Sequence, residues 1–341
     1  MQFTGFVSAL GIALALTGCG PSEETSGQGG SGGQVTTTGG SGGSGGTAGG
    51  APIVDPALFD CTASKPPVRT NSIPTACATD PTCTTKLVSG HRAAGGELGV
   101  IAPEDTVAAV NAAVVLGIDF VETDPRPTKD GVLINLHDPT VDRTTFGTGE
   151  AAQMTLAEIQ ALELKTSEYA GDFSCARIPT FEEVLTAAKG KVHVLVDANK
   201  TDQVALLVEA IQKTDTLEWA IFDTDSVEKI DQALALEPAL LTMIRVADLN
   251  ELNTELAHFA AHPPVIVEVH DGADGGALTP AIHDANNRAL VDVFVTDVGA
   301  GLSDDPSLYD EAWAPGFDML QTDRPDLVLR NLGRWPPAPQ P

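Results

Sequence analysis

The chain has 341 residues, 42% of them hydrophobic, which is enough for one large domain or two small ones around a buried core. Its formal net charge of -28 at pH 7 argues against nucleic acid as a partner, because phosphate binding needs clustered lysines and arginines. The same charge is compatible with an exported protein and with the binding of divalent cations.

The N-terminal segment MQFTGFVSALGIALALTGCG is apolar, too short for a comfortable membrane span, and ends in small residues. We therefore predict an export signal over residues 1–18. Its LTGC sequence resembles a bacterial lipobox, which would make Cys19 the lipidated first residue of the mature chain, with an ordinary secretory signal as the alternative. Because Gly20 rather than an aspartate follows, we expect an exported lipoprotein at the outer membrane, in the periplasm or at the cell surface.

Residues 19–52 are dominated by glycine and serine, a composition that predicts a flexible tether between the membrane anchor and a folded domain. A proline-rich segment follows over residues 53–86. It contains three of the four cysteines other than Cys19, and the fourth is Cys175. In an exported chain an even number suggests disulfides, here with three possible connectivities, and a zinc site is the weaker alternative because no C-x-x-C unit is present. We expect bridges that pin residues 53–86 to the domain.

From Lys86 onward, short strand-like runs alternate with amphipathic helical stretches. Thr155 with Glu158, and Thr180 with Glu183, match capping boxes that open helices, and Gly117 is a helix stop. The strand-like runs are KLVSGH, GIDFVE, VLINLH, KVHVLVD, WAIFD, ALLTMI, VIVEV, LVDVFVTD and DMLQTD. Such alternation predicts an α/β fold with a parallel sheet covered by helices.

Residues 87–335 have about the length of a typical (β/α)8 TIM barrel. Nine candidate strands exceed the eight of a barrel, so one of them is misassigned or lies outside it. A doubly wound open sheet is the alternative fold. Polar residues at the carboxyl ends of successive runs favour the barrel, because that end carries the active site in barrels. These residues are His91, Glu122, Asp124, His137, Asp197, Glu268, Asp297 and Asp323.

Several of these side chains suit chemistry on a phosphate ester. Glu122 and Asp124 are two residues apart on a strand, so both point to the same side, and together with one more carboxylate they suit Mg²⁺ or Ca²⁺. His91 and His137 can act as acid and base near neutral pH, while Arg92 offers a planar fork for phosphate oxygens. A metal, two histidines and an arginine describe phosphoester cleavage better than acyl transfer.

Other charged residues have plainer interpretations. Glu268 and His270 end a strand on the same face, where an ion pair or a loop role explains them as well as a supporting role in the site does. His193 lies inside a strand and is expected to be a packed core residue. After the glycine- and serine-rich residues 19–52, the sequence contains no G-x-S-x-G elbow and no Walker loop, which weakens serine-hydrolase and nucleotide-binding interpretations.

The blocks HRAAGGELGVIAPEDT, VETDPRPTKDGVLINLHDPTVDRTT, IPTFEEVL and GFDMLQTDRPDLV resemble, in this order, the glycerophosphodiester phosphodiesterase family. The resemblance implies a (β/α)8 barrel with an insertion after the third strand, at about residues 139–176. It implies His91 and His137 as the acid/base pair, Arg92 as the phosphate ligand, and Glu122 and Asp124 as metal ligands. Glu104 would have a supporting role near the metal.

The sequence departs from the family pattern in three places, the mildest being PEDT for the family's P-E-N-T, which keeps Glu104. The family takes a third metal ligand from a Glu-x-Lys on the fourth strand, where this chain has Asp197 and Asn199, with Lys200 directly after them. We expect Asp197 to bind the metal, Asn199 to support it, and Lys200 to replace the family lysine at the phosphate. The family motif H-R-G ends in Ala93 here, so we expect a turn without positive φ.

The resemblance implies a metal-dependent hydrolase that converts glycerophosphodiesters to glycerol phosphate and an alcohol, using Ca²⁺ or Mg²⁺ and two-histidine acid/base catalysis. Two alternatives remain open. One is a phospholipase D-like enzyme that acts on lysolipids or sphingolipids and forms a cyclic phosphate. The other is a non-catalytic lipoprotein that binds a ligand, suggested by Asn199. The expected partners are a small glycerophosphodiester and the membrane, reached through the lipid anchor.

Overall fold

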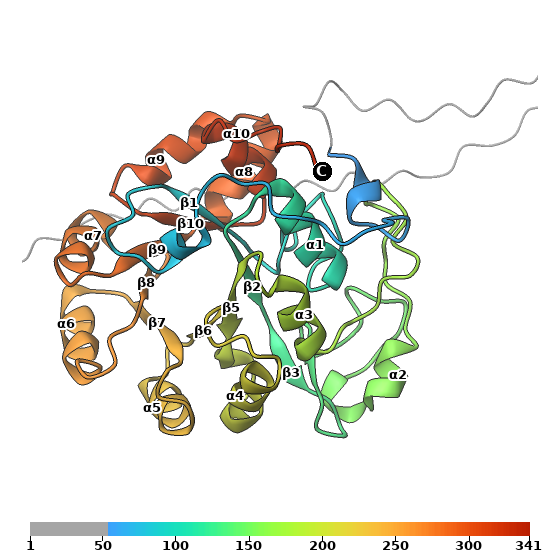
Figure 1. The fold of residues 1–341 in the computed structure, drawn as a ribbon, viewed down its shortest axis with the longest axis horizontal. Coiled ribbons are helices and arrows are strands. Elements are labelled where there is room, and N and C mark those ends of the chain that lie inside the picture. Colours follow the sequence, from blue (N-terminus) through green and yellow to red (C-terminus); the bar gives the residue numbers. More distant parts are fainter. Residues whose placement is uncertain (1–53) are drawn as a thin grey trace, which may run out of the picture. The chain divides into compact units, whose positions relative to one another are not determined.

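The computed structural model describes residues 54–341, so the predicted export signal, Cys19 and the glycine-rich tether lie outside the described residues. Within residues 54–341, eight parallel strands close into a barrel in the order β1, β10, β9, β8, β7, β6, β5, β2, and helices surround it (Figure 1). The predicted (β/α)8 barrel is confirmed, and the closed sheet rules out the doubly wound alternative. None of the helices in this part of the chain is long and apolar enough to cross a membrane.

Each barrel strand is short, and one or more helices follow most of them. The strands are β1 (Leu87–Gly90), β2 (Phe120–Thr123), β5 (His193–Asp197), β6 (Ala220–Asp223), β7 (Leu241–Val246), β8 (Ile266–Val269), β9 (Arg288–Asp292) and β10 (Met319–Thr322). The helices are α1 (Val107–Leu116), α2 (Leu156–Gln160), α3 (Phe181–Ala188), α4 (Val204–Lys213), α5 (Val227–Leu236), α6 (Leu249–His258), α7 (Gly275–Asp284), α8 (Phe294–Ser303), α9 (Tyr309–Trp313) and α10 (Pro325–Asn331).

The run VLINLH is the strand that lies outside the barrel. It forms β4 (Leu133–Asn135), which pairs antiparallel with β3 (Pro125–Pro127) in a separate two-stranded sheet. A parallel neighbour needs a crossover of about a dozen residues or more, and the short stretch 128–132 only turns the chain back. The insertion therefore begins after the second barrel strand, not the third, and Asp197 ends the third barrel strand, not the fourth.

A second correction concerns the run LVDVFVTD, which we expected to be one strand ending at Asp297. Strand β9 stops at Asp292, whose side chain accepts a hydrogen bond from the backbone N–H of Phe294 at 2.9 Å, and helix α8 begins there. Asp297 consequently lies in the first turn of α8 and is fully buried. The apolar residues 293–295 hid this boundary, because a short apolar run does not distinguish a strand from a helix.

The helix signals in the sequence are confirmed. Both capping boxes form, with Thr155 and Glu158 at the start of α2 and Thr180 and Glu183 at the start of α3. Helix α1 ends at Gly117, which adopts the left-handed conformation with φ 74° that glycine favours. This helix is buried on most of its surface between the barrel and its neighbours.

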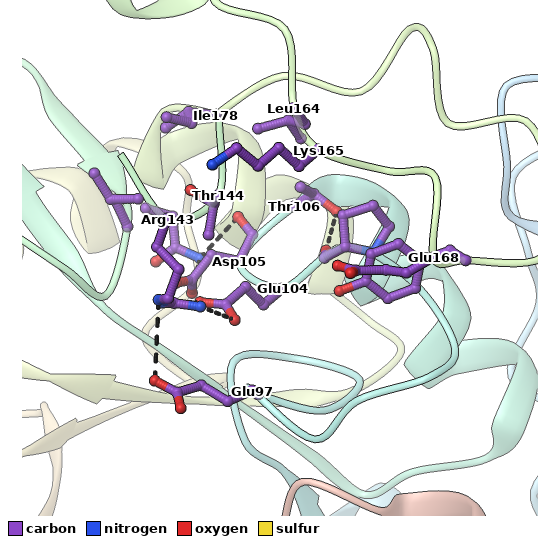
Figure 2. Close-up of a pocket in the computed structure, with 15 residues that line it drawn as sticks. Glu97, Glu104, Asp105, Thr106, Arg143, Thr144, Leu164, Lys165, Glu168 and Ile178 are labelled. Atoms are coloured by element: carbon purple, nitrogen blue, oxygen red, sulfur yellow. Dashed lines mark hydrogen bonds and ion pairs between the residues drawn. The ribbon is translucent and has the colours of Figure 1, made fainter. Parts of the chain in front are cut away.

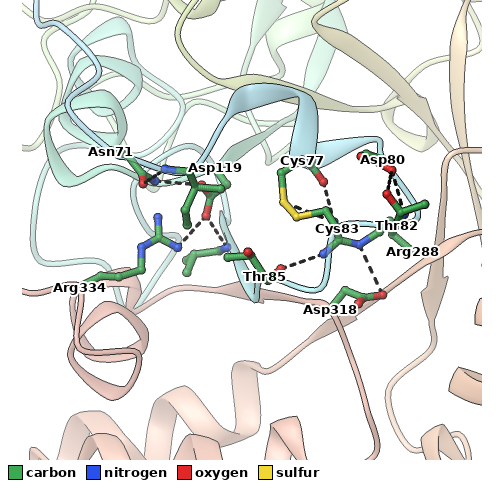
Figure 3. The surroundings of a disulfide bond; sticks show 12 residues. Asn71, Cys77, Asp80, Thr82, Cys83, Thr85, Asp119, Arg288, Asp318 and Arg334 are labelled. Atoms are coloured by element: carbon green, nitrogen blue, oxygen red, sulfur yellow. Dashed lines mark hydrogen bonds and ion pairs between the residues drawn. A yellow bond between two sulfur atoms is a disulfide. The ribbon is translucent and has the colours of Figure 1, made fainter.

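The amino-terminal end of the barrel is closed by the segment that precedes β1. Apolar side chains from all eight strands pack there against Cys77 and Ala78, and the disulfide Cys77–Cys83 holds this loop in place (Figure 3). Arg288 is fully buried beneath it and donates hydrogen bonds to the carbonyl oxygens of Cys77 and Thr85. The loop thus closes the barrel floor with both apolar packing and hydrogen bonds.

The disulfide Cys61–Cys175 ties the N-terminal segment to the insertion. A buried carboxylate adds a polar connection, because Asp119 accepts hydrogen bonds from Arg69, Asn71 and Arg334 (Figure 3). The expectation that disulfides pin residues 53–86 to the domain is confirmed for Cys61–Cys175, whereas Cys77–Cys83 closes a loop inside the segment. The structure thus selects one of the three possible connectivities.

Candidate active site

Three buried carboxylates meet at the carboxyl end of the barrel. The side chains of Glu122 and Asp124, at the end of β2, point to the same side. Asp197 ends the neighbouring strand β5, which pairs in parallel with β2. Within this cluster one ligand atom from each residue lies within 4.8 Å of the others. The predicted convergence of these three residues is therefore present.

The cluster has the properties of a site for a hard divalent cation. Asp124 is fully buried, and neither of its carboxylate oxygens has a hydrogen-bond partner in the part of the chain that the structure describes. Burial, and then the charges of Asp124 and Asp197, raise the pKa of Glu122 well above its usual range. Three crowded carboxylates that include the two unpartnered oxygens of Asp124 suit Mg²⁺ or Ca²⁺.

Lys200 reaches this cluster even though it is one position removed from the family lysine. Residues Ala198–Lys200 form a 3₁₀ turn directly after β5, which brings the Lys200 Nζ within 3.3 Å of Asp124 Oδ1 and 3.5 Å of Asp197 Oδ2. Asn199 instead accepts a hydrogen bond from Thr224 through its side chain, while its backbone N–H binds Asp197 Oδ1 at 2.8 Å. Lys200 thus places a positive charge beside the carboxylates, although the neutral Asn199 occupies the position of the family lysine.

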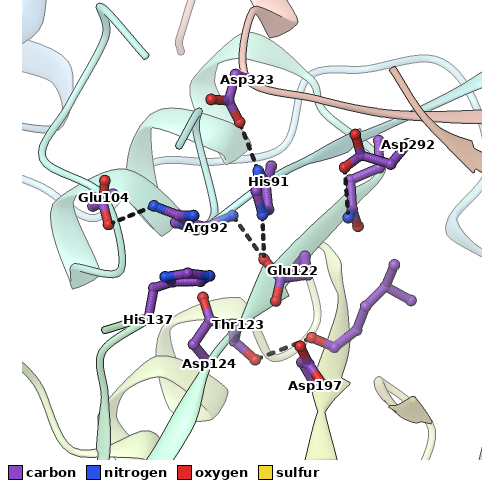
Figure 4. Close-up of polar contacts among 12 residues, drawn as sticks. His91, Arg92, Glu104, Glu122, Thr123, Asp124, His137, Asp197, Asp292 and Asp323 are labelled. Carbon is purple, nitrogen blue, oxygen red and sulfur yellow. Dashed lines mark hydrogen bonds and ion pairs between the residues drawn. The ribbon is translucent and has the colours of Figure 1, made fainter. Parts of the chain in front are cut away.

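His91 and His137 face each other beside the carboxylates, with ring centroids 6.5 Å apart and ring planes at 87° (Figure 4). The Nδ1 of His91 lies 2.6 Å from Asp323 Oδ1, and the Nδ1 of His137 lies 2.8 Å from Asp138 Oδ1. Each ring is therefore oriented by a carboxylate at Nδ1, and its Nε2 is left for a ligand. The Nε2 of His91 is 3.8 Å from Glu122 Oε2.

The two imidazoles have opposite electrostatic surroundings. Burial lowers the pKa of His91, but the hydrogen bond to Asp323 and the charges of Asp292 and Asp323 outweigh it, so the pKa is raised. Burial dominates at His137 and lowers its pKa, against the raising effects of Asp124 and Asp138. Two titratable groups whose surroundings shift their pKa values apart are suited to act as an acid and a base.

Arg92 lies between these groups and a buried ion-pair network. Its Nη1 lies 3.1 Å from Glu104 Oε1, its backbone N–H binds Glu122 Oε2 at 2.9 Å, and its Nε has no hydrogen-bond partner among residues 54–341. Arg143, from the insertion, binds both oxygens of Glu104 and both oxygens of Asp138. The insertion therefore fixes the positions of Arg92 and His137 through one guanidinium.

A cavity of about 300 Å³ opens behind this network, between the insertion and residues 96–106 (Figure 2). Glu104, Asp105 and Arg143 line it. Asp105 is buried and accepts hydrogen bonds from the backbone N–H of His137 and the side chain of Asn135. His137 follows β4 rather than a barrel strand, so Asp105 brings it to the barrel mouth.

The turn after β1 differs from our expectation. Arg92 and Ala93 have φ values of 49° and 80°, so this turn does require positive φ although glycine is absent from both positions. The conformation is held by backbone hydrogen bonds, including one from Ala93 N–H to the Glu122 carbonyl oxygen at 3.0 Å. It turns the Arg92 side chain toward Glu104. The steric cost of positive φ is higher for arginine and alanine than it would be for glycine.

Glu268 takes the ion-pair role that we considered for it. Its Oε2 lies 3.2 Å from Arg245 Nε, and Arg245 also binds both carboxylate oxygens of Asp223. We had not considered Arg245 or Asp223 as site residues. An arginine inside the apolar run of β7 was the signal that could have identified them, because a buried arginine requires carboxylate partners.

Asp297 acts behind the histidines rather than among them. It accepts hydrogen bonds from the Tyr309 hydroxyl at 2.5 Å, from the Thr322 hydroxyl at 2.6 Å and from the backbone N–H of Asp323 at 2.7 Å. Burial raises its pKa to about 7, although these three donors act in the opposite direction. Asp297 thus holds the end of β10, from which Asp323 orients His91.

A parallel barrel with a buried carboxylate cluster and two carboxylate-bound histidines at its mouth defines a barrel protein with a candidate metal-assisted hydrolytic site. The family described as "Glycerophosphoryl diester phosphodiesterase family" matches residues 91–326, which is more than half of the chain. The chain belongs to this family.

Individual relatives match over shorter stretches. A putative glycerophosphodiester phosphodiesterase of Bacillus subtilis is 40% identical over 110 residues, which are 32% of this chain and 43% of that protein. A glycerophosphodiester phosphodiesterase of Caldanaerobacter subterraneus is 45% identical over 98 residues, 29% of this chain and 38% of that one. The chain thus matches less than half the length of these curated relatives.

Solved structures support the fold over a larger part of the chain. A glycerophosphoryl diester phosphodiesterase of Parabacteroides distasonis superposes with a TM-score of 0.64 at 21% identity, covering 80% of this chain and 95% of that one. An Oleispira antarctica phosphodiesterase in complex with the product sn-glycerol-3-phosphate gives 0.61 at 21% identity, covering 74% and 99%.

Proposed function

We propose that this protein is a divalent-metal-dependent phosphodiesterase that hydrolyses glycerophosphodiesters to glycerol phosphate and an alcohol. The observation that carries the proposal is the convergence of the buried carboxylates Glu122, Asp124 and Asp197 with two histidines whose Nδ1 atoms are bound to Asp323 and Asp138. Membership of the family and the product named for the Oleispira antarctica neighbour support this substrate class.

Glu122, Asp124 and Asp197 would hold the divalent ion, which would neutralise charge on the phosphodiester and polarise it toward attack. Arg92 and Lys200 complete the positive side of the site. The Arg92 guanidinium is fixed by Glu104 and keeps its Nε free for a phosphate oxygen. The Lys200 ammonium, which lies against the carboxylates here, has a flexible stem that lets it turn to the phosphate.

The two histidines would transfer the protons of the reaction. His137, with its lowered pKa, is neutral and accepts a proton at Nε2 from the attacking water. His91, with its raised pKa, is protonated and donates from Nε2 to the oxygen of the leaving alcohol. The new P–O bond forms to the water oxygen as the P–O bond to the alcohol breaks, so one proton is taken up and one is released.

The proposal is tested by measuring glycerol phosphate release from glycerophosphocholine with the wild type and His137→Ala. Loss of an acid/base group costs about 10²–10⁴-fold in rate, and that loss is the expected result. His270→Ala is the matched control, because His270 follows β8 at the same end of the barrel but we assign it no role. Full activity in His137→Ala would refute the assignment. A cyclic phosphate among the products would show that a hydroxyl group of the substrate, rather than water, is the nucleophile.

We also propose that the chain is an exported lipoprotein anchored through Cys19. The LTGC sequence and the glycine- and serine-rich residues after it support this proposal. Metabolic labelling with radioactive palmitate in a bacterial host should label the wild type and leave Cys19→Ala unlabelled. Equal labelling of both proteins, or of neither, would exclude anchoring at this residue.

A further inference from the structure

One side of the barrel mouth carries three inward-facing carboxyl groups that the proposed mechanism does not use. Ile221, Ile266 and Leu290 pack inside the barrel floor, and side chains two residues further along a strand point to the same side. Asp223, Glu268 and Asp292 therefore face the barrel interior from β6, β8 and β9, one layer nearer the mouth. We call these three residues the acidic wall.

The acidic wall is short of positive charge. Arg245 binds Asp223 through two hydrogen bonds and lies 3.2 Å from Glu268, so one guanidinium is shared by two carboxyl groups. Within the described part of the chain, Asp292 accepts hydrogen bonds only from neutral donors, the Gln321 side chain at 3.2 Å and the backbone N–H of Phe294 at 2.9 Å. No lysine or arginine within residues 54–341 forms an ion pair with Asp292.

Two buried acceptor atoms at this wall have no hydrogen-bond partner in the described part of the chain, and both point to a ligand. Glu268 Oε2 and Gln321 Oε1 belong to residues that are 8% and 7% exposed. The Arg245 Nε–H donates to Asp223, so its closeness to Glu268 does not satisfy that oxygen. A buried acceptor without a partner destabilises the protein, and a bound hydrogen-bond donor would remove this cost.

The position of the acidic wall relates it to the leaving group. Arg245 Nη2 is 3.7 Å from Asp197 Oδ1, so the wall begins at the edge of the carboxylate cluster. Asp292 and Asp323 lie beyond His91 as seen from His137 (Figure 4), and the charges of both act on the His91 ring. An alcohol that takes its proton from His91 therefore leaves toward Asp292.

We propose that the acidic wall is the subsite for the leaving alcohol and that it selects alcohols carrying a positively charged amine. The proposal rests on the proposed function for the direction of departure. A neutral polyol could donate hydrogen bonds to Gln321 and Glu268 but would leave the negative charge of Asp292 unbalanced. An ammonium group supplies the missing positive charge, and an anionic group would be repelled.

The test compares glycerophosphoethanolamine, whose alcohol carries a positively charged amine that donates hydrogen bonds, with glycerophosphoglycerol, whose alcohol is neutral. The measured quantity is the ratio of kcat/KM for the two substrates, in the wild type and in Asp292→Asn. Asparagine keeps the shape and the acceptor for the Phe294 N–H but removes the charge. We expect the wild type to favour glycerophosphoethanolamine, and the ratio to fall about fivefold or more in the variant, as for the loss of one partly buried charge contact. Asp271→Asn, an exposed aspartate after β8, is the matched control and should keep the wild-type ratio.

Binding separates failure of the subsite from failure of the proposed function. Both substrates are titrated by calorimetry into His137→Ala and into His137→Ala with Asp292→Asn. Tighter binding of glycerophosphoethanolamine that is lost with Asp292→Asn supports the subsite, even if the wild type hydrolyses neither substrate and the proposed function fails. Equal affinity for the two substrates, binding of neither, or an unchanged preference in Asp292→Asn would overturn the subsite, whether or not the wild type is active.

Discussion

His193 provides a quantitative test of how the barrel floor is built. Its ring lies in the barrel interior, 5.0 Å from the Trp219 ring centroid and 5.8 Å from that of Phe120, and the residue is 5% exposed. Burial, and then the charge of Arg69, lowers the pKa of His193 to about 4 from an ordinary value of 6.5. The folded protein therefore holds this imidazole neutral at a pH where the unfolded chain would bind a proton.

The sign of the effect follows from this difference. Because the pKa of His193 is lower in the folded protein than in the unfolded chain, this residue does not reduce stability above pH 6.5. As the pH falls from 6.5 toward 4, the unfolded chain binds a proton that the folded protein does not, and the free energy of unfolding decreases. A shift of about 2.5 pKa units corresponds to about 3 kcal/mol when the loss is complete, and to about 2 kcal/mol at pH 5. His193→Phe keeps an aromatic ring in the same packing and removes the titration.

The measurement is the free energy of unfolding in urea at pH 7.5 and pH 5 for both proteins. The many surface carboxylates titrate in both, so they cancel in the comparison. We expect the wild type to lose about 2 kcal/mol more than His193→Phe between these pH values. His262→Phe, at an exposed position, is the control and should behave as the wild type does. An identical pH dependence in His193→Phe and the wild type would show that the buried imidazole is not neutral, and would refute the reasoning.

Two further predictions concern the site and the cross-links. Asp323→Asn removes the carboxylate that raises the pKa of His91. In the profile of kcat/KM against pH, the alkaline limb should therefore move to lower pH while the acidic limb stays. An alkaline limb that does not move would contradict the role of His91 as the acid. The disulfides close loops of very different length, with sequence separations of 114 for Cys61–Cys175 and 6 for Cys77–Cys83. Replacing each pair by serines should lower the free energy of unfolding in urea by about 5 and about 2 kcal/mol respectively, and equal losses would contradict the loop-entropy explanation.

Much of the site could be predicted because it follows local periodicity. Glu122 and Asp124 are two residues apart on a strand, so their shared direction follows from strand geometry alone. The carboxyl ends of parallel strands meet at one end of a barrel, which places Asp197 with them. The histidine before Asp138 carries its own orienting carboxylate. These features need no knowledge of which strands are neighbours.

The remaining features depend on contacts between distant elements. Arg245 meets Asp223 and Glu268 only because β6, β7 and β8 are adjacent in the closed sheet. Asp297 was assigned to a strand because residues 293–295 are apolar, although the helix begins at Phe294. The sequence of β4 resembles that of a barrel strand. Only the turn between β3 and β4, which is too short for the crossover that a parallel neighbour needs, indicates a hairpin. Contacts between elements that are distant in the sequence cannot be inferred from local sequence patterns.

The central claim is that a divalent ion held by Glu122, Asp124 and Asp197 makes this protein a phosphodiesterase. The most direct test is the rate of glycerol phosphate release from glycerophosphocholine before chelation, after chelation, and after Ca²⁺ or Mg²⁺ is restored, with Asp124→Asn measured in parallel. We predict that the wild type loses its activity to the chelator and regains it with one of the two ions, whereas Asp124→Asn stays inactive throughout. A wild-type rate that the chelator leaves unchanged, or an Asp124→Asn variant as active as the wild type, would contradict the claim.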